Sequence, residues 1–557
     1  MKKTRYTWFF AAFSVVSSCF FLGFKAGDEH AFQIAKNLDV FSAIVKELDM
    51  LYVDSLDADK TIRTGIDAML YSLDPYTAYY PEEDSSELEQ MLKNSYGGIG
   101  SIITYDSKRK RTVISEPYEG MPAAQVGLRP GDFLLDIDGK DLYEMNTKKV
   151  SEMLRGEVGT KFRLRVERPG VKKPLSFDIV RRSIQLPVIP YYGKLDDGVG
   201  YIKLSTFSGN PSKEFKRAFL DLKQQGIRAL VIDLRDNGGG LLDESVEIAN
   251  FFLPRGKTLV TTKGKLSQVG QTYKTLREPI DQQIPLAVLV NNSTASSSEI
   301  LAGSLQDLDR AVIVGTRTYG KGLVQTTRAL PYGANMKITT SKYYIPSGRC
   351  VQAIDYTHRN EDGSVGRIPD SLTTVFHTAA GREVRDGGGI TPDVQVEPDK
   401  LPNILYYLVA GNYIFDYATQ YCLNRSSIAP AEQFSISDSE YDDFKKYIAE
   451  SDFKYNQQTE KMLKNLKEIA EFEGYLKDAD SEFAALESKL KHNLDYDLDF
   501  SKKMIKEYLA EEILKRYYFQ KGVIIQQLKD DKELKEAVKI LSDEEKYSSM
   551  LRPKAVE

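Results

Sequence analysis

Short apolar runs, each followed by a turn, dominate the middle of the chain. Residues 229–234, 285–290 and 311–314 are almost wholly apolar, as is typical of strands buried within a sheet. Residues 299–308 follow the second run and have a helical pattern of apolar positions. This strand–helix–strand order predicts an α/β core in which the turn after the third run returns beside the end of the second.

The pattern is helical towards both ends of the chain. From about residue 31 to 90, apolar side chains recur at three- and four-residue spacing, which predicts helices. These side chains are Phe32, Ile34, Ala35, Leu38, Phe41, Ile44, Val45 and Leu48. After Pro430 glycine and proline are rare, and residues 504–514 are amphipathic at helical spacing. We therefore expect a helical accessory region from about residue 399, with its charged runs on solvated helix faces.

The start of the chain forms a distinct segment. Lys2, Lys3 and Arg5 precede an apolar stretch over residues 8–24. Its length of 17 residues is intermediate between that of a long signal-peptide core and that of a short membrane span. The basic residues ahead of it predict that the bulk of the chain lies outside the cytoplasm. We expect an uncleaved membrane anchor, and the alternative is a cleaved or lipidated form, since residues 16–19 weakly resemble a lipoprotein cleavage box.

Composition places the chain among ordinary globular proteins of several domains. A length of 557 residues predicts three or four domains, and a hydrophobic content of 41% argues against broad disorder. The net charge of −5 argues against nucleic-acid binding. We find no clustered cysteine–histidine metal motif and no phosphate-binding glycine loop. Cys350 and Cys422 could form a bridge in an oxidising compartment or remain free thiols.

Ser296 and Lys321 are the residues with the clearest catalytic potential. Ser296 lies at the predicted strand-to-helix turn, where helix N-terminal amides can face developing negative charge. A serine hydroxyl needs a base to become a nucleophile, and a lysine made neutral by burial can serve. None of the four histidines lies in a setting that indicates a Ser–His–Asp triad, so a Ser/Lys dyad is predicted. These histidines are His30, His358, His377 and His492.

Both residues also have a purely structural explanation. Ser296 and Glu299 have the spacing of a helix capping box, which is common where helices begin. Lys321 lies between Gly320 and Gly322, and a lysine in such a turn is usually a solvated loop residue. The pair gains weight as a catalytic dyad only from the rest of the chain.

Five motifs around the pair follow one another in a specific order. They lie at residues 200–207, 233–240, 293–300, 319–325 and 388–393. In these motifs the chain resembles the C-terminal processing proteases, tail-specific serine proteases that carry a PDZ domain, over roughly residues 35–398. The resemblance implies that Ser296 is the nucleophile, Lys321 the general base and Gln325 the residue that orients the lysine. Gln325 would share a face with Lys321 if that stretch were helical.

A glycine-rich turn follows the first of the predicted buried strands. Glycines there let backbone N–H groups approach a ligand closely, although a plain strand-to-helix connection would look the same. The resemblance implies that the amides of Gly239 and Ser297 bind the oxyanion. The family usually has proline where this chain has Gly238.

Residues 92–182 contain two signatures that resemble a PDZ domain. Residues 96–101 resemble the loop that binds a peptide's terminal carboxylate, and an ordinary glycine turn is the alternative for this loop alone. Residues 122–133 form the second signature, a short helix followed by a Gly/Pro turn that leads into a strand at 133–137.

The PDZ resemblance implies a tail-binding site. The amides of Ile99, Gly100 and Ser101 would hold the terminal carboxylate of a peptide whose backbone adds to the sheet edge. Residues 147–154 should form the helix that lines the groove, with Val150 and either Met153 or Leu154 facing the peptide.

We therefore expect a multidomain α+β protein, with a small β-rich PDZ domain before an α/β (crotonase-like) protease core and helical regions at both ends. The expected order begins with a signal sequence or membrane anchor at residues 1–27 and an N-terminal helical region at 28–91. The PDZ domain follows at 92–182, the protease core at 183–398 and a C-terminal helical accessory domain at 399–557.

The expected function is that of a serine endopeptidase that cleaves proteins recognised by their free C-terminal tails. No metal, organic cofactor or nucleic acid is required. The expected location is the bacterial cell envelope, on the periplasmic side and held in the inner membrane by the N-terminal segment, and a homo-oligomer is left open. One alternative is a membrane-anchored PDZ adaptor with a catalytically silent protease-like core. Another is an enzyme that stays silent until a tail or partner binds.

Overall fold

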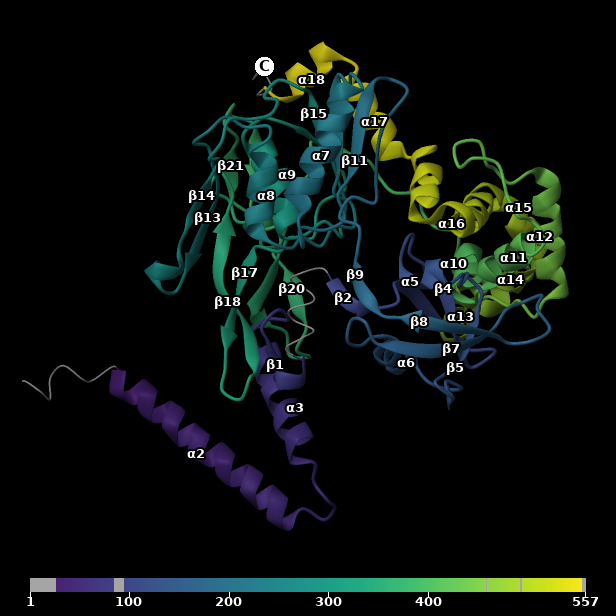
Figure 1. The fold of residues 1–557 in the computed structure, drawn as a ribbon, viewed down its shortest axis with the longest axis horizontal. Helices are drawn as coiled ribbons and strands as arrows, with labels where there is room; N and C mark the ends of the chain where they lie inside the picture. Colours follow the sequence, from purple (N-terminus) through teal and green to yellow (C-terminus); the bar gives the residue numbers. More distant parts are fainter. Residues whose placement is uncertain (1–26, 85–94, 457, 491–492, 553–557) are drawn as a thin grey trace, which may run out of the picture. The chain divides into compact units, whose positions relative to one another are not determined.

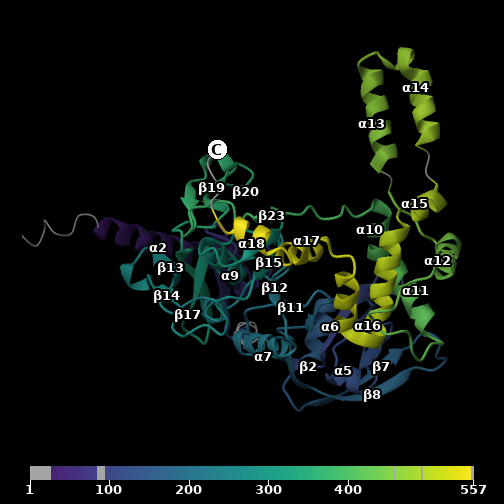
Figure 2. The same ribbon diagram turned by 90° about the horizontal axis from the view of Figure 1, so that it is seen from above.

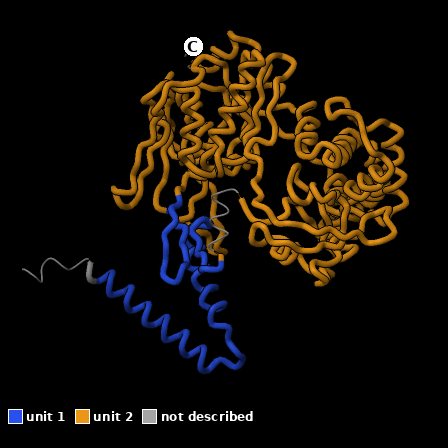
Figure 3. Tube along the Cα trace, in the orientation of Figure 1, with its two compact units in different colours: residues 1–83, 325–339 blue, residues 84–324, 340–557 orange. Residues whose placement is uncertain are grey.

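The computed structural model describes residues 27–84, 95–456, 458–490 and 493–552 (Figure 1). The chain divides into two compact units, residues 1–83 with 325–339 and residues 84–324 with 340–557 (Figure 3). The predicted membrane segment at residues 8–24 lies outside the described residues. Within the described ranges, no helix is both long and apolar enough to cross a bilayer.

The smaller unit consists of helices, one short strand and the tip of a hairpin. Its N-terminal elements are α2 (Gly27–Leu51), α3 (Ala58–Tyr71), β1 (Ala78–Tyr80) and the 3₁₀ turn η1 (Glu82–Asp84). Of the helices predicted from apolar spacing over about residues 31–90, α2 and α3 are confirmed, whereas residues 78–80 form a strand and residues 85–90 lie outside the described residues. The Asp57 side chain accepts the Lys60 N–H at 3.0 Å, so α3 begins with a side-chain cap. β1 pairs antiparallel with residues 335–337 at the start of β18 (Asn335–Tyr344).

A β-rich domain opens the larger unit. Its elements are β2 (Ser95–Gly98), β3 (Ser101–Asp106), β4 (Arg111–Pro117), α5 (Pro122–Gln125), β5 (Phe133–Ile137), β6 (Lys140–Asp141), α6 (Thr147–Leu154), β7 (Lys161–Glu167), β8 (Leu175–Val180) and β9 (Arg182–Gln185). The sheet order is β3-β4-β5-β7-β8, with β6 on β5, while β2 pairs with β9. In β7, Phe162, Leu164 and Val166 are buried and the residues between them are exposed, so one face of the sheet packs into the core with α6.

A six-stranded sheet forms the centre of the larger unit. In spatial order its strands are β10 (Tyr191–Lys194), β11 (Val199–Lys203), β12 (Ala229–Asp233), β15 (Leu286–Val290), β16 (Val312–Gly315) and β23 (Val394–Gln395). All neighbours are parallel except the edge strand β10. Every residue of β12, β15 and β16 is buried, which explains the continuous apolar runs and confirms the three predicted strands.

Helices from distant parts of the chain cover the two faces of this sheet. One face packs against α7 (Pro211–Gln224), α8 (Leu242–Ala249) and α9 (Ser297–Asp307). The other face packs against α17 (Lys532–Leu541) and α18 (Glu544–Met550). Tyr547 of α18 accepts the N–H of Leu286 in β15 at 3.0 Å. The end of the chain thus supplies one layer of the core.

A second sheet contains β13 (Thr258–Gly264), β14 (Thr272–Lys274), β17 (Leu323–Ala329) and β18. Gln325 lies in β17, so the helix considered for residues 321–325 is wrong. Glycines on both sides of Lys321 disfavour a helix, and the residues that follow pair as a strand. Two small hairpins, β19 (Ile354–Arg359) with β20 (Val365–Arg367) and β21 (Val375–His377) with β22 (Glu383–Arg385), complete this part of the chain.

The C-terminal region is helical, as predicted. Before α17 it contains α10 (Asn403–Ala410), α11 (Tyr413–Cys422), α12 (Asp438–Glu450), α13 (Gln458–Phe472), α14 (Leu476–Lys489), α15 (Leu494–Phe500) and α16 (Lys502–Leu528). These helices have a core of their own, with Tyr441, Phe444 and Leu509 fully buried. α13 and α14 form a helical hairpin (Figure 2). Cys350 and Cys422 are free thiols, so the bridge left open by the sequence is absent.

Candidate active site

Three loops at the carboxyl ends of neighbouring strands bring the candidate residues together. β12 leads into residues 234–240, β15 into residues 291–296 and β16 into residues 316–322. Because the carboxyl ends of parallel strands meet at one edge of a sheet, ligands commonly bind there. Backbone hydrogen bonds of 3.0 Å join the loops, from Tyr319 N–H to the Thr294 carbonyl and from Ala295 N–H to the Asn237 carbonyl.

Ser296 occupies a strained turn between β15 and α9. Its φ of 57° and ψ of −118° lie in a region that residues with a side chain rarely adopt. Ser296 is partly exposed, while its neighbours Ala295 and Ser297 are buried. A sharp strand-to-helix turn of this kind is known to present a nucleophilic serine at the edge of a sheet.

A buried carboxylate joins the serine loop to the lysine loop. Oε1 of Glu299 accepts the Thr318 hydroxyl at 2.5 Å and the Gly320 N–H at 2.8 Å. Oε2 accepts the N–H groups of Ser296 at 2.9 Å and Lys321 at 2.8 Å. Burial raises the pKa of Glu299, and these four hydrogen bonds oppose the rise.

The capping-box interpretation of Glu299 is confirmed, and it does not compete with catalysis. The same oxygen that accepts the Ser296 N–H also accepts the Lys321 N–H, so the cap positions both candidate residues. Sequence reasoning missed this second bond. A carboxylate inside a buried helix needs several hydrogen-bond partners, and every residue of α9 is buried, so Glu299 was the residue that could have indicated a further contact.

The turn around Lys321 is fixed by close backbone packing. Gly320 has a φ of 87°, and a Cβ there would lie 2.3 Å from the Cβ of Ala353. Thr318 donates its N–H to the Ile390 carbonyl at 3.1 Å, and the Ile390 N–H donates to the Thr318 hydroxyl at 2.6 Å. The motif at residues 388–393 therefore supports the lysine loop.

The two bonds to Glu299 limit the distance between the backbones of Ser296 and Lys321. At 2.9 and 2.8 Å from one oxygen, the two nitrogens are less than about 6 Å apart. Both residues are partly exposed. The Gln325 amide donates to the Thr339 hydroxyl at 3.0 Å within the smaller unit, and its predicted role in orienting Lys321 stays a prediction.

The glycine turn lies directly against the serine loop. Gly239 has a φ of 99°, and a Cβ there would lie 2.8 Å from the Cβ of Ser296 and 3.0 Å from the N of Ser297. The Gly239 N–H donates to Oδ1 of Asn237 at 2.9 Å, so a bond to an oxyanion would share or replace this contact. Ser297 is the first residue of α9, a position whose N–H has no partner within its own helix.

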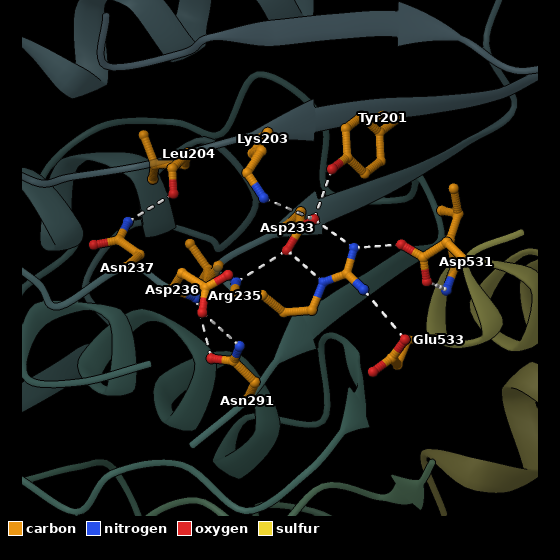
Figure 4. A network of polar contacts seen from close by, with 12 residues as sticks. Tyr201, Lys203, Leu204, Asp233, Arg235, Asp236, Asn237, Asn291, Asp531 and Glu533 are labelled. Carbon is orange, nitrogen blue, oxygen red and sulfur yellow. Dashed lines mark hydrogen bonds and ion pairs between the residues drawn. The ribbon is translucent and has the colours of Figure 1, made fainter. Parts of the chain in front are cut away.

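A polar network surrounds Asp233, the last residue of β12, shortly before the glycine turn in the sequence (Figure 4). Asp233 is fully buried and accepts two side-chain hydrogen bonds from Arg235, at 3.0 and 2.7 Å. It also accepts the Tyr201 hydroxyl at 2.6 Å and lies 3.7 Å from the Lys203 ammonium.

Over the part of the chain that the structure describes, no group of three His, Cys, Asp or Glu side chains could hold a metal ion.

The residues predicted to bind a peptide tail lie together in the β-rich domain. Gly100 has a φ of 71°, and a Cβ there would lie 2.5 Å from the Cβ of Met121. Ile99 is buried and Ser101 opens β3, which pairs only with β4 among the described residues. Val150 has no exposed surface and packs in the domain core, and its predicted contact with a peptide stays a prediction.

Three stretches of the chain match known protein families. Peptidase family S41 matches residues 198–358, and a PDZ domain matches residues 113–168. Residues 404–541 match the family described as "Probable PDZ-protease, C-terminal helical domain".

The chain is also similar to curated proteins over more than half its length. The carboxy-terminal-processing protease of Bartonella bacilliformis is 34% identical over 326 residues, which cover 58% of this chain and 74% of that protein. A probable CtpA-like serine protease of Staphylococcus aureus is 34% identical over 318 residues, covering 57% of this chain and 62% of that protein. The solved photosystem II D1 C-terminal processing protease is 28% identical and covers 65% of this chain and 93% of its own, with a TM-score of 0.36. The chain thus belongs to the carboxy-terminal-processing serine proteases of peptidase family S41, and it contains a PDZ domain.

Proposed function

We propose that this serine protease uses a Ser296–Lys321 dyad to cleave proteins that it recognises by their C-terminal tails. The Ser296 Oγ attacks the scissile carbonyl carbon while the Lys321 amine takes the hydroxyl proton. The amides of Gly239 and Ser297 bind the oxyanion, and the C–N bond breaks as Lys321 returns the proton to the leaving amine. Water, activated by the same lysine, then hydrolyses the acyl-enzyme.

The observation that carries this proposal is the shared bond to Glu299. One buried carboxylate oxygen accepts the backbone N–H of the proposed nucleophile and that of the proposed base. A helix cap alone requires only the first of these bonds, whereas a dyad requires the two loops to be held together. Ser296 also has the strained backbone that places a nucleophile at a strand-to-helix turn.

The lysine must be neutral to act as a base. A lysine in water has a pKa of about 10.4, which leaves very little of it neutral at pH 7. Substrate bound over the partly exposed Lys321 would remove water from it and favour the neutral amine.

We propose that the PDZ domain delivers the substrate tail. The tail's backbone would add to the edge of β3, and its carboxylate would bind the amides of Ile99, Gly100 and Ser101. Two observations support this placement: no strand of the described residues pairs with the second edge of β3, and Gly100 packs closely on Met121. Gln325, in its proposed role, would orient the dyad lysine.

We further propose that the protein acts on the periplasmic side of a bacterial envelope, held in the inner membrane by residues 8–24. The basic residues that precede this apolar stretch support that orientation. Self-association is a further expectation, and the mass of the purified protein by light scattering tests it. Protease protection of intact spheroplasts tests the location.

Proteolysis by the purified chain tests the chemistry. Ser296→Ala and Lys321→Ala variants are compared with the wild type on unfolded proteins with apolar C-termini, each paired with an amidated-tail control. We expect cleavage to be lost in both variants and weakened by amidation. Undiminished cleavage in either variant would contradict the dyad. Equal cleavage of free and amidated tails would contradict recognition by the carboxylate. Binding of tails without any cleavage would indicate an adaptor.

A further inference from the structure

Arg235 connects the glycine turn to the C-terminal helices (Figure 4). Its Nη2 donates to Oδ2 of Asp531 at 2.6 Å, and its Nη1 donates to Oε2 of Glu533 at 3.3 Å. Asp531 precedes α17 and Glu533 lies in its first turn. The two carboxylates thus reach a residue almost 300 positions earlier in the sequence.

The contacts of Arg235 are largely hidden from solvent. The exposed fraction of the side chain is 0% for Asp233, 14% for Arg235, 7% for Asp531 and 18% for Glu533. Although burial opposes ionisation of Asp233, the charge and hydrogen bonds of Arg235 lower its pKa to about 2. A guanidinium held on two sides in this way has little freedom, because moving it would leave a buried charge without its partners.

Arg235 lies two residues before the residue that organises the serine loop. The Asn237 carbonyl accepts the Ala295 N–H at 3.0 Å and the Ser298 hydroxyl at 2.9 Å. The Asn237 side chain accepts the Gly239 N–H at 2.9 Å. The Arg235 N–H itself donates to Asp233 at 2.9 Å, so backbone and side chain are fixed together. A shift of Arg235 would therefore be passed directly to the loops that carry Gly239 and Ser296.

Attachment of α17 does not depend on these two carboxylates. Leu534, Ala537 and Ile540 are buried against the core sheet, and Tyr547 bonds to β15. The N-terminal cap of α17 is also separate from the ion pair with Arg235, because Oδ1 of Asp531 accepts the Leu534 N–H at 2.8 Å while Oδ2 accepts from Arg235. The ion pairs thus add a polar constraint at one point of an apolar interface.

We propose that Asp531 and Glu533 are positioning residues for catalysis, which act through Arg235 to hold the glycine turn and the serine loop in their reactive geometry. This inference rests on the proposed Ser296 chemistry. It makes the C-terminal helices part of the active-site machinery rather than an appendage to it.

Isosteric substitutions in the full-length protein test the proposal. Asp531→Asn keeps an N-cap residue of similar strength and removes the charge that faces Arg235. Glu533→Gln removes the second charge without a change in size. Asp530→Asn is the matched control, since Asp530 is largely exposed and pairs with Lys535 on the surface. Each variant is assayed for kcat and KM on a tailed unfolded protein, for the rate of Ser296 labelling by a fluorophosphonate, and for thermal unfolding.

We expect the double variant to lose roughly tenfold to a hundredfold in kcat, as is typical of small displacements of catalytic groups. Labelling should slow in parallel, while KM and the folded state at the assay temperature are retained and Asp530→Asn matches the wild type. Unchanged kcat and labelling in the folded double variant, with or without a lower unfolding temperature, would overturn the proposal. If Ser296→Ala cleaves as well as the wild type, or the wild type is neither active nor labelled, the proposed function fails as well.

Discussion

Ser296 and Lys321 donate their backbone N–H groups to the same carboxylate oxygen of Glu299, at 2.9 and 2.8 Å. The two residues stand on loops that follow different strands, β15 and β16, so no local sequence rule brings them together. One buried acceptor contacts both residues, and the bond from the Tyr319 N–H to the Thr294 carbonyl also joins their loops. The geometry of the proposed dyad therefore depends on a side chain that takes no part in bond making.

Substitution of Glu299 by glutamine should impair both stability and activity. A glutamine has only one acceptor oxygen, so its N–H₂ group would face either the N–H groups of Ser296 and Lys321 or the Gly320 N–H and the Thr318 hydroxyl. We expect a loss of roughly 1–3 kcal/mol in the free energy of unfolding. We expect kcat to fall at least about tenfold, since a glutamine cannot accept all four hydrogen bonds and one of the two loops loses part of its support. Urea unfolding and peptide hydrolysis measure the two effects.

Glu244→Gln is the control for that experiment. Glu244 also accepts a backbone N–H, from Ser212 at 2.9 Å, but through one oxygen, which a glutamine can supply. We expect the Glu244→Gln substitution to leave kcat unchanged. If Glu299→Gln behaved like this control, the proposed role of the shared carboxylate would be wrong.

Adjacent glycines in the turn that follows β12 should differ sharply in their tolerance of alanine. A Cβ at Gly239 would meet Ser296 at 2.8 Å, and the φ of 99° is unfavourable for alanine. At Gly238 nothing lies within 4 Å of a Cβ, and its φ is not positive. We expect Gly239→Ala to reduce kcat by about a hundredfold or more and Gly238→Ala to have little effect. Similar kcat values for the two variants would argue against close packing at Gly239.

Tail recognition should depend on the close approach of Gly100 to Met121. Gly100 and Gly120 share a φ of 71°, but a Cβ at Gly100 would lie 2.5 Å from Met121, and at Gly120 nothing lies within 4 Å. Gly100→Ala should therefore displace the carboxylate loop and weaken binding of a labelled tail peptide about tenfold or more. Gly120→Ala carries the same backbone strain and controls for it. Fluorescence anisotropy gives both affinities, and equal values would exclude this loop as the tail site.

Stability should fall between about pH 4.5 and pH 8 because of Glu511. Burial raises its pKa from 4.5 to about 7, opposed by the Gln527 amide and by the charge of Lys515, while Glu507 and Glu512 raise it further. Because the pKa of Glu511 is higher in the folded state than in the unfolded chain, the protonated carboxyl contributes to the free energy of unfolding, and this contribution is complete below about pH 4.5. That contribution is lost as the pH rises through 7. The loss amounts to at most about 3 kcal/mol, and less where water reaches the carboxyl.

Glu511→Gln should flatten this part of the stability curve. Urea unfolding at pH 5 and pH 8 compares the wild type with this variant and with Glu545→Gln, a control at an exposed position. A wild-type curve that is no steeper than that of Glu511→Gln would contradict the raised pKa.

Elements with a strong local signal could be predicted well. The apolar runs of β12, β15 and β16 are continuous because both faces of these strands are covered, and such runs are readable without tertiary information. The serine turn and the glycine turns around Lys321 were also readable, because their residue types reflect local backbone requirements. Whether residues 321–325 are helical was left open by the sequence, because it depends on the pairing of β17 with β18.

The amino-acid sequence alone thus contains the family, the candidate nucleophile and base, and the order of the domains, since each depends on short motifs or local periodicity. Only the folded chain shows that Glu299 binds both the loop of Ser296 and the loop of Lys321, and that α17 covers the core sheet. The spacing of apolar residues in α17 predicts a buried face but not the surface that buries it. Likewise, Arg235 and Asp531 look like ordinary charged residues in sequence. Their pairing depends on distant segments meeting at one edge of the sheet, and that is decided by the packing of the whole chain.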